Sequence, residues 1–167
     1  MAVIKVNLPT DLQRQLEQAG REMDNIAESA LRAGADVLFK ASRARLQQSL
    51  AMPRKYPKRG TGELQSALGI SPVHKTEGGG YDIKVGFREP RNKQPGKRIG
   101  RSTKGGGYYV ATNAMVGNIL EHGHKGSNGG QAPAPWLAPA VQQAQKAAEE
   151  AVCKTVEKRL DEIFKDK

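Results

Sequence analysis

The sequence has little of what several functional classes require: one cysteine, few aromatic residues and no long apolar run. Cys153 alone excludes an internal disulfide and a metal site built from several cysteines. No segment approaches the roughly 20 consecutive apolar residues that a transmembrane helix needs. The first nine residues lack a basic region followed by an apolar one, so we expect no secretory signal. These absences predict a protein without a membrane contact that is made and used inside a cell, or in a particle assembled there.

Aromatic residues make up only 5% of the chain and hydrophobic residues 37%. A chain of 167 residues is most simply one domain with one core. That core must be built from Leu, Ile, Val and Ala side chains, so we expect it to be thin. Part of the apolar surface is therefore expected to find its partner in a neighbouring subunit.

Positive charge is what the chain has in excess, with 27 Lys and Arg against 17 Asp and Glu and a net charge of +10. Such an excess favours an acidic partner, or serves only solubility. The cations concentrate in residues 88–107, where Glu89 is the one acidic residue, and we expect a flexible basic loop there. Its candidate DNA- or partner-contact residues are Arg88, Arg91, Lys93, Lys97, Arg98, Arg101 and Lys104.

The basic loop has two possible partners. Its cations can neutralise phosphates, which would make binding salt-dependent and independent of base sequence, and Tyr108 and Tyr109 stand just beyond it, where they can stack on bases. No helix-turn-helix or zinc finger accompanies it, so the chain has no device for reading bases. The same loop can equally dock on an acidic protein surface.

Apolar and small residues at three- and four-residue steps predict two long helices. The first runs from Asp11 to about Leu50, with a possible break at Asp24–Asn25. Its small residues allow another backbone to approach closely, and we expect this stripe to pack on a sheet. The second helix runs from Pro135 to about Phe164, and Cys153 is expected to be packed within it.

Alternating apolar and polar residues predict four short strands. They are Val3–Leu8, Ile70–His74, Tyr81–Phe87 and Tyr108–Thr112. Residues 75–80 form a hairpin loop between the second and third strands. We expect the fourth strand to return and pair with the third.

Between these elements, Thr61–Leu68 predicts one or two helical turns, and Ala114–Glu121 a short helix or strand. The sequence therefore predicts an α+β fold. A long N-terminal helix and a long C-terminal helix pack on a small antiparallel β-sheet, with the long basic loop attached.

Candidate chemistry is sparse. His122 and His124 beside Glu121 suggest metal ligands, but zinc needs three or four ligands in a tetrahedral arrangement. The other candidate ligands are His74 and Cys153, and both are distant in sequence from this segment. The glycine-rich segments lack the order of a phosphate-binding loop, and no Gly-x-Ser-x-Gly elbow is present. We therefore predict no metal, no cofactor, no catalytic residues and no enzymatic activity.

Four features appear in a fixed order: the N-terminal strand with its long Ala-rich helix, Thr61–Ile70, Ile119–His124, and Ala132–Ala140 before the last helix. The second reads Thr-Gly-Glu-Leu-Gln-Ser-Ala-Leu-Gly-Ile, the third Ile-Leu-Glu-His-Gly-His, and the fourth Ala-Pro-Ala-Pro-Trp-Leu-Ala-Pro-Ala. In this order the chain resembles the neck or tail-completion family of long-tailed bacteriophages and prophages. Its members are also described as minor tail components or head–tail joining proteins.

The resemblance implies one domain over residues 1–167 with a non-catalytic, structural role at the head–tail junction. It also implies a ring of identical subunits, neighbouring neck and tail proteins as partners, and a place in the virion after assembly in the host cytoplasm. The long basic loop departs from the family pattern, and DNA would pass near it. The alternative is a small nucleic-acid-binding module that uses the same loop without sequence specificity.

The stretch between residues 119 and 141 connects these expectations. Leu120 and Trp136 are expected to lock the last helix onto the core, while residues 125–131 form an exposed loop. In the family interpretation this loop contacts the next ring. The candidate structural or interface residues are Leu64, Leu120, Glu121, His122, Trp136 and Leu137.

Overall fold

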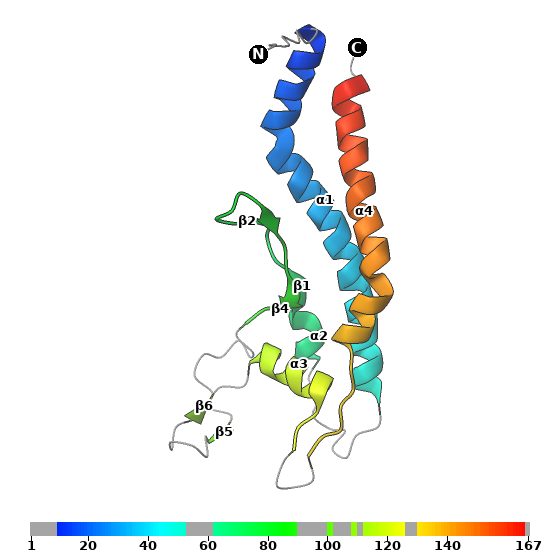
Figure 1. The fold of residues 1–167 in the computed structure, drawn as a ribbon. Helices are drawn as coiled ribbons and strands as arrows, with labels where there is room; N and C mark the ends of the chain where they lie inside the picture. Colours follow the sequence, from blue (N-terminus) through cyan, green and yellow to red (C-terminus); the bar gives the residue numbers. More distant parts are fainter. Residues whose placement is uncertain are drawn as a thin grey trace, which may run out of the picture.

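Two long helices form the frame of the molecule. The computed structural model describes residues 10–52, 62–89, 100–101, 108–109, 112–125 and 130–165. Helix α1 spans Thr10–Ala51 and helix α4 spans Leu137–Lys165, which confirms both predicted long helices. They lie side by side and antiparallel, so the two chain ends are at the same end of the pair (Figure 1). Helix α1 continues through Asp24–Asn25 without a break and is about 63 Å long.

The small residues of α1 face α4. Ala30 and Gly34 are buried, and a Cβ atom on Gly34 would lie 2.6 Å from Val152 Cγ2 and 3.2 Å from the Ala148 carbonyl oxygen. The stripe therefore brings a second backbone close, as expected, but that backbone belongs to a helix and not to the sheet. Strands β1, β3 and β4 also contact α1, and the predicted α+β class is confirmed.

The end of the helix pair that carries both chain ends holds a second, smaller cluster. Ala19 and Ile26 of α1 pack with Ile163 of α4. Val156 and Leu160 of α4 pack against this cluster, whereas Leu16 and Met23 of α1 remain 48% and 49% exposed. At this end, therefore, few large side chains are buried between α1 and α4, as the low aromatic content predicts.

A short helix and an interrupted hairpin pack against α1. Helix α2 spans Glu63–Ala67, and strand β1 (Leu68–Ile70) follows it directly. Strand β1 pairs antiparallel with β4 (Val85–Phe87). Farther along the same hairpin, β2 (His74–Lys75) pairs antiparallel with β3 (Tyr81–Asp82). The predicted hairpin and helical turns are confirmed.

The hairpin is interrupted, although two uninterrupted strands were expected. Strand β1 ends at Ile70 and β2 begins at His74, with Pro72 between them. Proline has no backbone N–H to donate to a partner strand, so regular pairing stops there. Across the gap, the Ser71 N–H donates to the Lys84 carbonyl at 2.8 Å, and the Lys84 N–H donates to Ser71 Oγ at 2.9 Å.

Asp24 holds the tip of this hairpin on α1. Its carboxylate accepts hydrogen bonds from Lys75 Nζ at 2.5 Å and from the Tyr81 hydroxyl. These two bonds, that of Lys75 foremost, hold the pKa of Asp24 below its ordinary value. Three polar side chains thus fix the position of β2 and β3 along the helix.

One strand pairing was predicted wrongly. Strand β6 (Tyr108–Tyr109) pairs with β5 (Gly100–Arg101) and not with Tyr81–Phe87. A partner only a few residues away closes a shorter loop and costs less chain entropy than a distant one. The predicted strand Val3–Leu8 and most of the predicted basic loop lie outside the described residues.

Helix α3 spans Asn113–His122 and settles the choice between helix and strand there. Thr112 precedes the helix as its N-cap, and its hydroxyl accepts from the Met115 N–H at 3.0 Å. Cys153 is exposed on α4, so the expectation that it is packed was wrong. Within the described ranges, no helix has the length and apolar character to cross a membrane.

Candidate assembly interface

The main core lies where α2, α3 and the start of α4 meet the second half of α1. Trp136 lies in this core and is 4% exposed. Leu120 of α3 and Leu64 of α2 belong to the same core, and both are buried. The buried cluster is Leu46, Leu64, Leu68, Leu120, Ala134 and Trp136.

Trp136 is held by its ring and by its nitrogen. The indole Nε1–H donates to the Gly117 carbonyl at 3.2 Å, and the ring lies 5.2 Å from that of Phe87, centroid to centroid. A Cβ atom on Gly117 would lie 2.3 Å from Phe87 Cε2. Glycine at 117 therefore lets α3 approach Phe87 closely enough for its carbonyl to reach the tryptophan.

The chain leaves the core at Gly123 and returns at Ala134. His124 and Gln131 exchange backbone hydrogen bonds, at 2.9 Å from the His124 N–H and 2.7 Å from the Gln131 N–H. The Ala134 N–H then donates to the Leu120 carbonyl at 2.8 Å. Gly123 has φ 75° and ψ 179°, a backbone conformation essentially reserved for glycine. Backbone hydrogen bonds therefore join the two ends of the segment between Gly123 and Ala134.

Glu121, the second-last residue of α3, caps α4. Its Oε2 accepts from the N–H groups of Trp136 at 2.7 Å and Leu137 at 2.8 Å, and its Oε1 accepts from that of Ala138 at 3.0 Å. The first N–H groups of a helix have no partner within the helix, and its N-terminus attracts negative charge. One carboxylate therefore joins the end of α3 to the beginning of α4. We call Glu121, Gly123 and Trp136, with the groups they bond, the α3–α4 joint.

The protonation of Glu121 reflects this bonding. Partial burial opposes its charge and would raise its pKa, but the N–H donors of Leu137, Ala138 and Trp136 act in the other direction. His122 adds a smaller effect of the same sign as these donors. The net result is a pKa below the ordinary value of 4.5. The carboxylate therefore remains charged, and α4 remains capped, below the pH at which a free glutamate takes up a proton.

Glu121→Gln is expected to lower the free energy of unfolding by about 1–3 kcal/mol at pH 7, because the amide keeps one neutral acceptor oxygen and replaces the other by an NH2 group that cannot accept from the N–H groups of α4. Since the folded pKa of Glu121 is depressed, its contribution is fully present above the unfolded pKa and is lost as pH falls through the folded pKa. The difference in urea midpoint between the wild type and the variant should therefore shrink as pH falls below about 4.5.

Glu157→Gln is the matched control, because Glu157 is an exposed carboxylate on the same helix, α4. It should change the urea midpoint little at any pH. An equal loss of stability in both variants, or a difference for Glu121→Gln that does not depend on pH, would show that the carboxylate does not cap α4.

An apolar groove of about 490 Å³ begins beside the joint. Helix α1 forms its floor, Ile83 and Val85 form one wall, and the first half of α4 forms the other. Leu137 and Val141 at the α4 wall are each 39% exposed. The residues lining the groove are Leu31, Gly34, Ala35, Leu38, Ser42, Ile83, Val85, Leu137, Val141, Gln145, Ala148, Glu149 and Val152.

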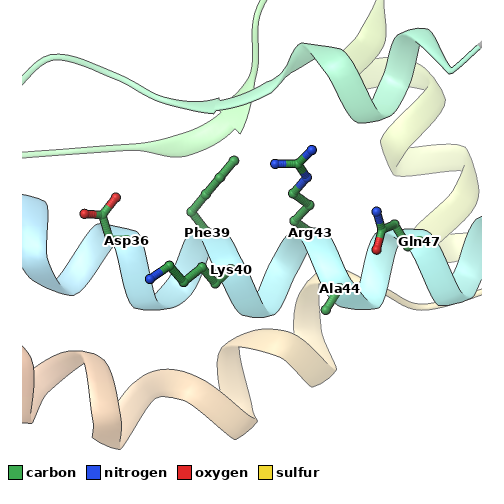
Figure 2. A pocket seen from close by; sticks show the side chains of 6 residues that line it. All are labelled: Asp36, Phe39, Lys40, Arg43, Ala44 and Gln47. Atoms are coloured by element: carbon green, nitrogen blue, oxygen red, sulfur yellow. The ribbon is translucent and has the colours of Figure 1, made fainter.

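A second hollow of about 400 Å³ lies along α1. Figure 2 shows Phe39 and Arg43 extending from α1 toward the neighbouring strands, with α4 on the other side of the helix. The Arg43 guanidinium lies 6.0 Å from the centre of the Phe39 ring. Asp36 and Lys40 on its rim are exposed, so the hollow resembles an ordinary solvated helix face.

Of the seven predicted contact residues, the structure describes two. Arg88 is described and exposed just after β4, and Arg101 is described as part of β5. Arg91, Lys93, Lys97, Arg98 and Lys104 lie outside the described residues.

The predicted structural residues are largely brought together. Leu64, Leu120 and Trp136 share the main cluster, and Glu121 bonds the N–H of Leu137. His122 is exposed at the end of α3 and does not join them. Among the described residues, no group of three or more His, Cys, Asp or Glu side chains has the arrangement of a metal site.

Several important residues were not singled out from the sequence. Gly117 and Phe87 matter through their mutual contact, which joins α3 to β4. Ser49 of α1 donates to the Pro135 carbonyl at 3.1 Å, and the Asn113 amide donates to the Arg88 carbonyl at 3.0 Å. Contacts between residues so far apart leave no periodic pattern in the sequence. The only local signal is that glycine inside a helix carries a cost and therefore has a packing reason.

Comparison with known proteins gives one family match. The model of the HK97-gp10-like family, described as "Bacteriophage HK97-gp10, putative tail-component", matches residues 10–123. The matched range runs from the start of α1 through α3 and Gly123. No curated protein and no solved structure gives a significant match.

Proposed function

The chain belongs to the HK97-gp10-like family of bacteriophage tail components, and we propose that it acts in head–tail joining or tail completion of a tailed phage or prophage. In this proposal it is a non-catalytic, single-domain subunit of a ring in the neck or tail of the virion. Its partners are further copies of itself and the neighbouring neck and tail proteins. It reaches the particle from the host cytoplasm, where assembly takes place.

The observation that carries this proposal is the family match over residues 10–123. That range contains the long helix, the interrupted hairpin and α3, which together build one side of the main core. The match ends just after Glu121, which caps the remaining long helix. A structural role is consistent with Glu121 and Trp136, because their contacts hold helices α3 and α4 in place.

The distribution of charge supports a basic end that faces DNA. Helix α1 carries six cations and six anions, and α4 carries five of each, so the whole net charge of +10 falls outside the two helices. Residues 88–107 leave from the end of β4, beside the start of α3, where the Ala114 N–H donates to Glu89 Oε1 at 2.8 Å. Helix α3 lies far from both chain ends (Figure 1). In a ring, the basic ends would therefore share one surface.

Labelling of phage particles tests the proposed place in the virion. A small epitope on the C-terminus, which lies far from α3 (Figure 1), should let gold-labelled antibody bind at the head–tail junction in electron micrographs. Particles that lack the protein should accumulate as separate heads and tails. Label elsewhere on the particle, or normal joined particles without the protein, would contradict the proposal.

Changing Arg98, Arg101 and Lys104 together to Ala tests the contact with DNA. If these cations neutralise phosphates, a plot of log affinity against log salt concentration for duplex DNA should become shallower by about 2–3 units. Fluorescence anisotropy at several salt concentrations measures this slope. The variant should also reduce joining if DNA passes this surface during assembly.

The matched control changes three exposed cations of the helices, Arg14, Arg21 and Lys158, to Ala. It removes the same charge and should leave the salt slope unchanged. If the two triple variants behave alike, the contact is not local to residues 88–107. A wild-type chain that binds DNA with salt sensitivity, stays monomeric and has no affinity for neck proteins would favour the alternative function, a non-specific nucleic-acid-binding module.

A further inference from the structure

The apolar groove has the form of an unfilled strand site. Its wall at Ile83 and Val85 comes from the hairpin, and no residue of β1 lines it, so β4 is the strand nearest to the groove. Strand β4 pairs with β1 on one edge, and within the described part of the chain no strand pairs with its other edge. An open strand edge beside an apolar trough is the arrangement that accepts an added strand.

The backbone of β4 is oriented for such an addition. The Arg88 N–H donates to the Ala67 carbonyl at 2.8 Å, and the Lys84 carbonyl accepts from the Ser71 N–H at 2.8 Å. Antiparallel strands direct alternate residues toward and away from the partner strand. Val85 and Phe87, which alternate with those bonded residues, therefore direct their N–H and carbonyl groups toward the open edge.

The sequence contains one segment with the matching pattern. Residues 3–8 read Val-Ile-Lys-Val-Asn-Leu, with Ile4, Val6 and Leu8 on one face and Lys5 and Asn7 on the other. Six residues in extended form span about 20 Å. The floor of the groove, from Leu31 to Ser42 of α1, is about 17 Å long at 1.5 Å per helical residue.

The segment of the same chain is too short to fill the groove. Leu31, at the near end of the groove floor, is about 32 Å along α1 from Thr10. Ile4 precedes Thr10 by six residues, so even a fully extended chain brings it only about 21 Å from Thr10. The apolar face of residues 3–8 therefore ends about 10 Å short of the groove in its own subunit.

We propose that residues 3–8 of a second copy of this chain bind in the groove as an extended strand along the open edge of β4. Ile4, Val6 and Leu8 face the apolar floor and the α4 wall. Lys5 lies toward the rim, where Glu149 is exposed and accepts only the Gln145 amide, at 2.9 Å, among the described contacts. The groove is thus matched in pattern, length and charge by one segment of the chain.

Where the groove of each copy is filled by one neighbour and its own segment enters the groove of another, the contact is head-to-tail, whereas reciprocal insertion between two copies would close a dimer. Repeated head-to-tail contacts close into a ring when the rotation between copies permits it. The inference therefore deepens the proposed ring, and it rests on the proposed function for the presence of neighbouring copies.

Disulfide trapping between two different chains tests the exchange. In a Cys153→Ser background, one chain carries Val6→Cys and the other carries Val141→Cys, at the α4 wall of the groove. The two are mixed as purified oligomer or, if the purified chain is monomeric, as assembled particles. Mild oxidation should join unlike chains, at least about tenfold more than when Gln142→Cys replaces Val141→Cys. Gln142 is the control because it is exposed on α4 but does not line the groove.

Val141→Asp gives a second measurement, because an apolar strand that binds in the groove would have to bury the new carboxylate without a partner. It should weaken self-association about tenfold or more by light scattering, whereas Gln142→Asp should leave it unchanged. Equal trapping at 141 and 142, no trapping between unlike chains, or trapping only within one chain that carries both cysteines would overturn the inference. Failure of trapping in particles labelled at the head–tail junction would reject the exchange and leave the proposed function intact. Trapping without incorporation into particles would reject the proposed function instead.

Discussion

Trp136→Ala is expected to lower the free energy of unfolding by about 3–5 kcal/mol, the range for removing a large aromatic side chain from a core. Trp136 is 4% exposed and packs with Leu64 and Leu120. Its removal leaves a void that these side chains fill only in part. Urea unfolding followed by circular dichroism measures the loss, since the variant no longer contains a tryptophan to report fluorescence.

The expected loss has two separable parts. Trp136→Phe keeps a ring beside Phe87 but removes the indole N–H that donates to the Gly117 carbonyl. That variant should lose about 1–3 kcal/mol, because it gives up the indole hydrogen bond and leaves a smaller void than alanine does. Alanine at the same position loses both the packing and the hydrogen bond.

Phe164→Ala is the control for aromatic truncation. Phe164 lies near the end of α4, is 37% exposed and does not belong to the main cluster. Its removal should cost well under half as much as that of Trp136. If the two truncations cost the same, the α3–α4 joint is not the main anchor of the last helix.

Gly123→Ala is the second substitution with a large expected effect, a loss of about 2–4 kcal/mol. Gly123 has φ 75° with ψ 179°, which L-residues rarely adopt. A Cβ atom there would also lie 2.7 Å from the Gln131 carbonyl oxygen and 2.9 Å from Pro133 Cδ. Both neighbours are held by the backbone bonds that return the chain to the core, so neither can move away freely.

Gly79→Ala separates the backbone cost from the clash. Gly79 also has a positive φ, 78°, but a Cβ atom there would meet nothing within 4 Å. It should cost about 1–2 kcal/mol, less than Gly123→Ala. Thermal unfolding of the two variants provides the comparison. An equal or smaller loss for Gly123→Ala would mean that the return of the chain at Gln131 and Pro133 is not tightly held.

Sequence periodicity was sufficient for elements whose signal is local and repeated. The apolar spacing of α1 and α4 extends over many turns, so both helices could be predicted with nearly correct ends. The hairpin that carries β1 to β4 was also predictable, because its two arms follow each other along the chain with one short loop between them. The pairing of Tyr108–Tyr109 was not, because a strand of two residues carries too little pattern to identify its partner.

The candidate residues divide in the same way. Leu120 and Trp136 could be singled out because an apolar pair, Ile119 and Leu120, and the chain's single tryptophan stand on either side of the loop that precedes the last helix. The role of Glu121 could not be predicted from spacing, since its three N–H donors lie 15–17 residues away. Cys153 was misjudged because position on a long helix does not say which face is buried.

The sequence by itself determined the two long helices, the excess of positive charge outside them and the ordered motifs of the tail-component family. These are properties of composition and local spacing, which need no knowledge of distant contacts. Only the tertiary structure decided that the small-residue stripe of α1 faces a helix, that Glu121 caps α4, and that a groove opens beside β4. Each of these depends on which distant backbone approaches, and that is set by the combined packing of Gly34, Gly117 and Trp136 in three dimensions.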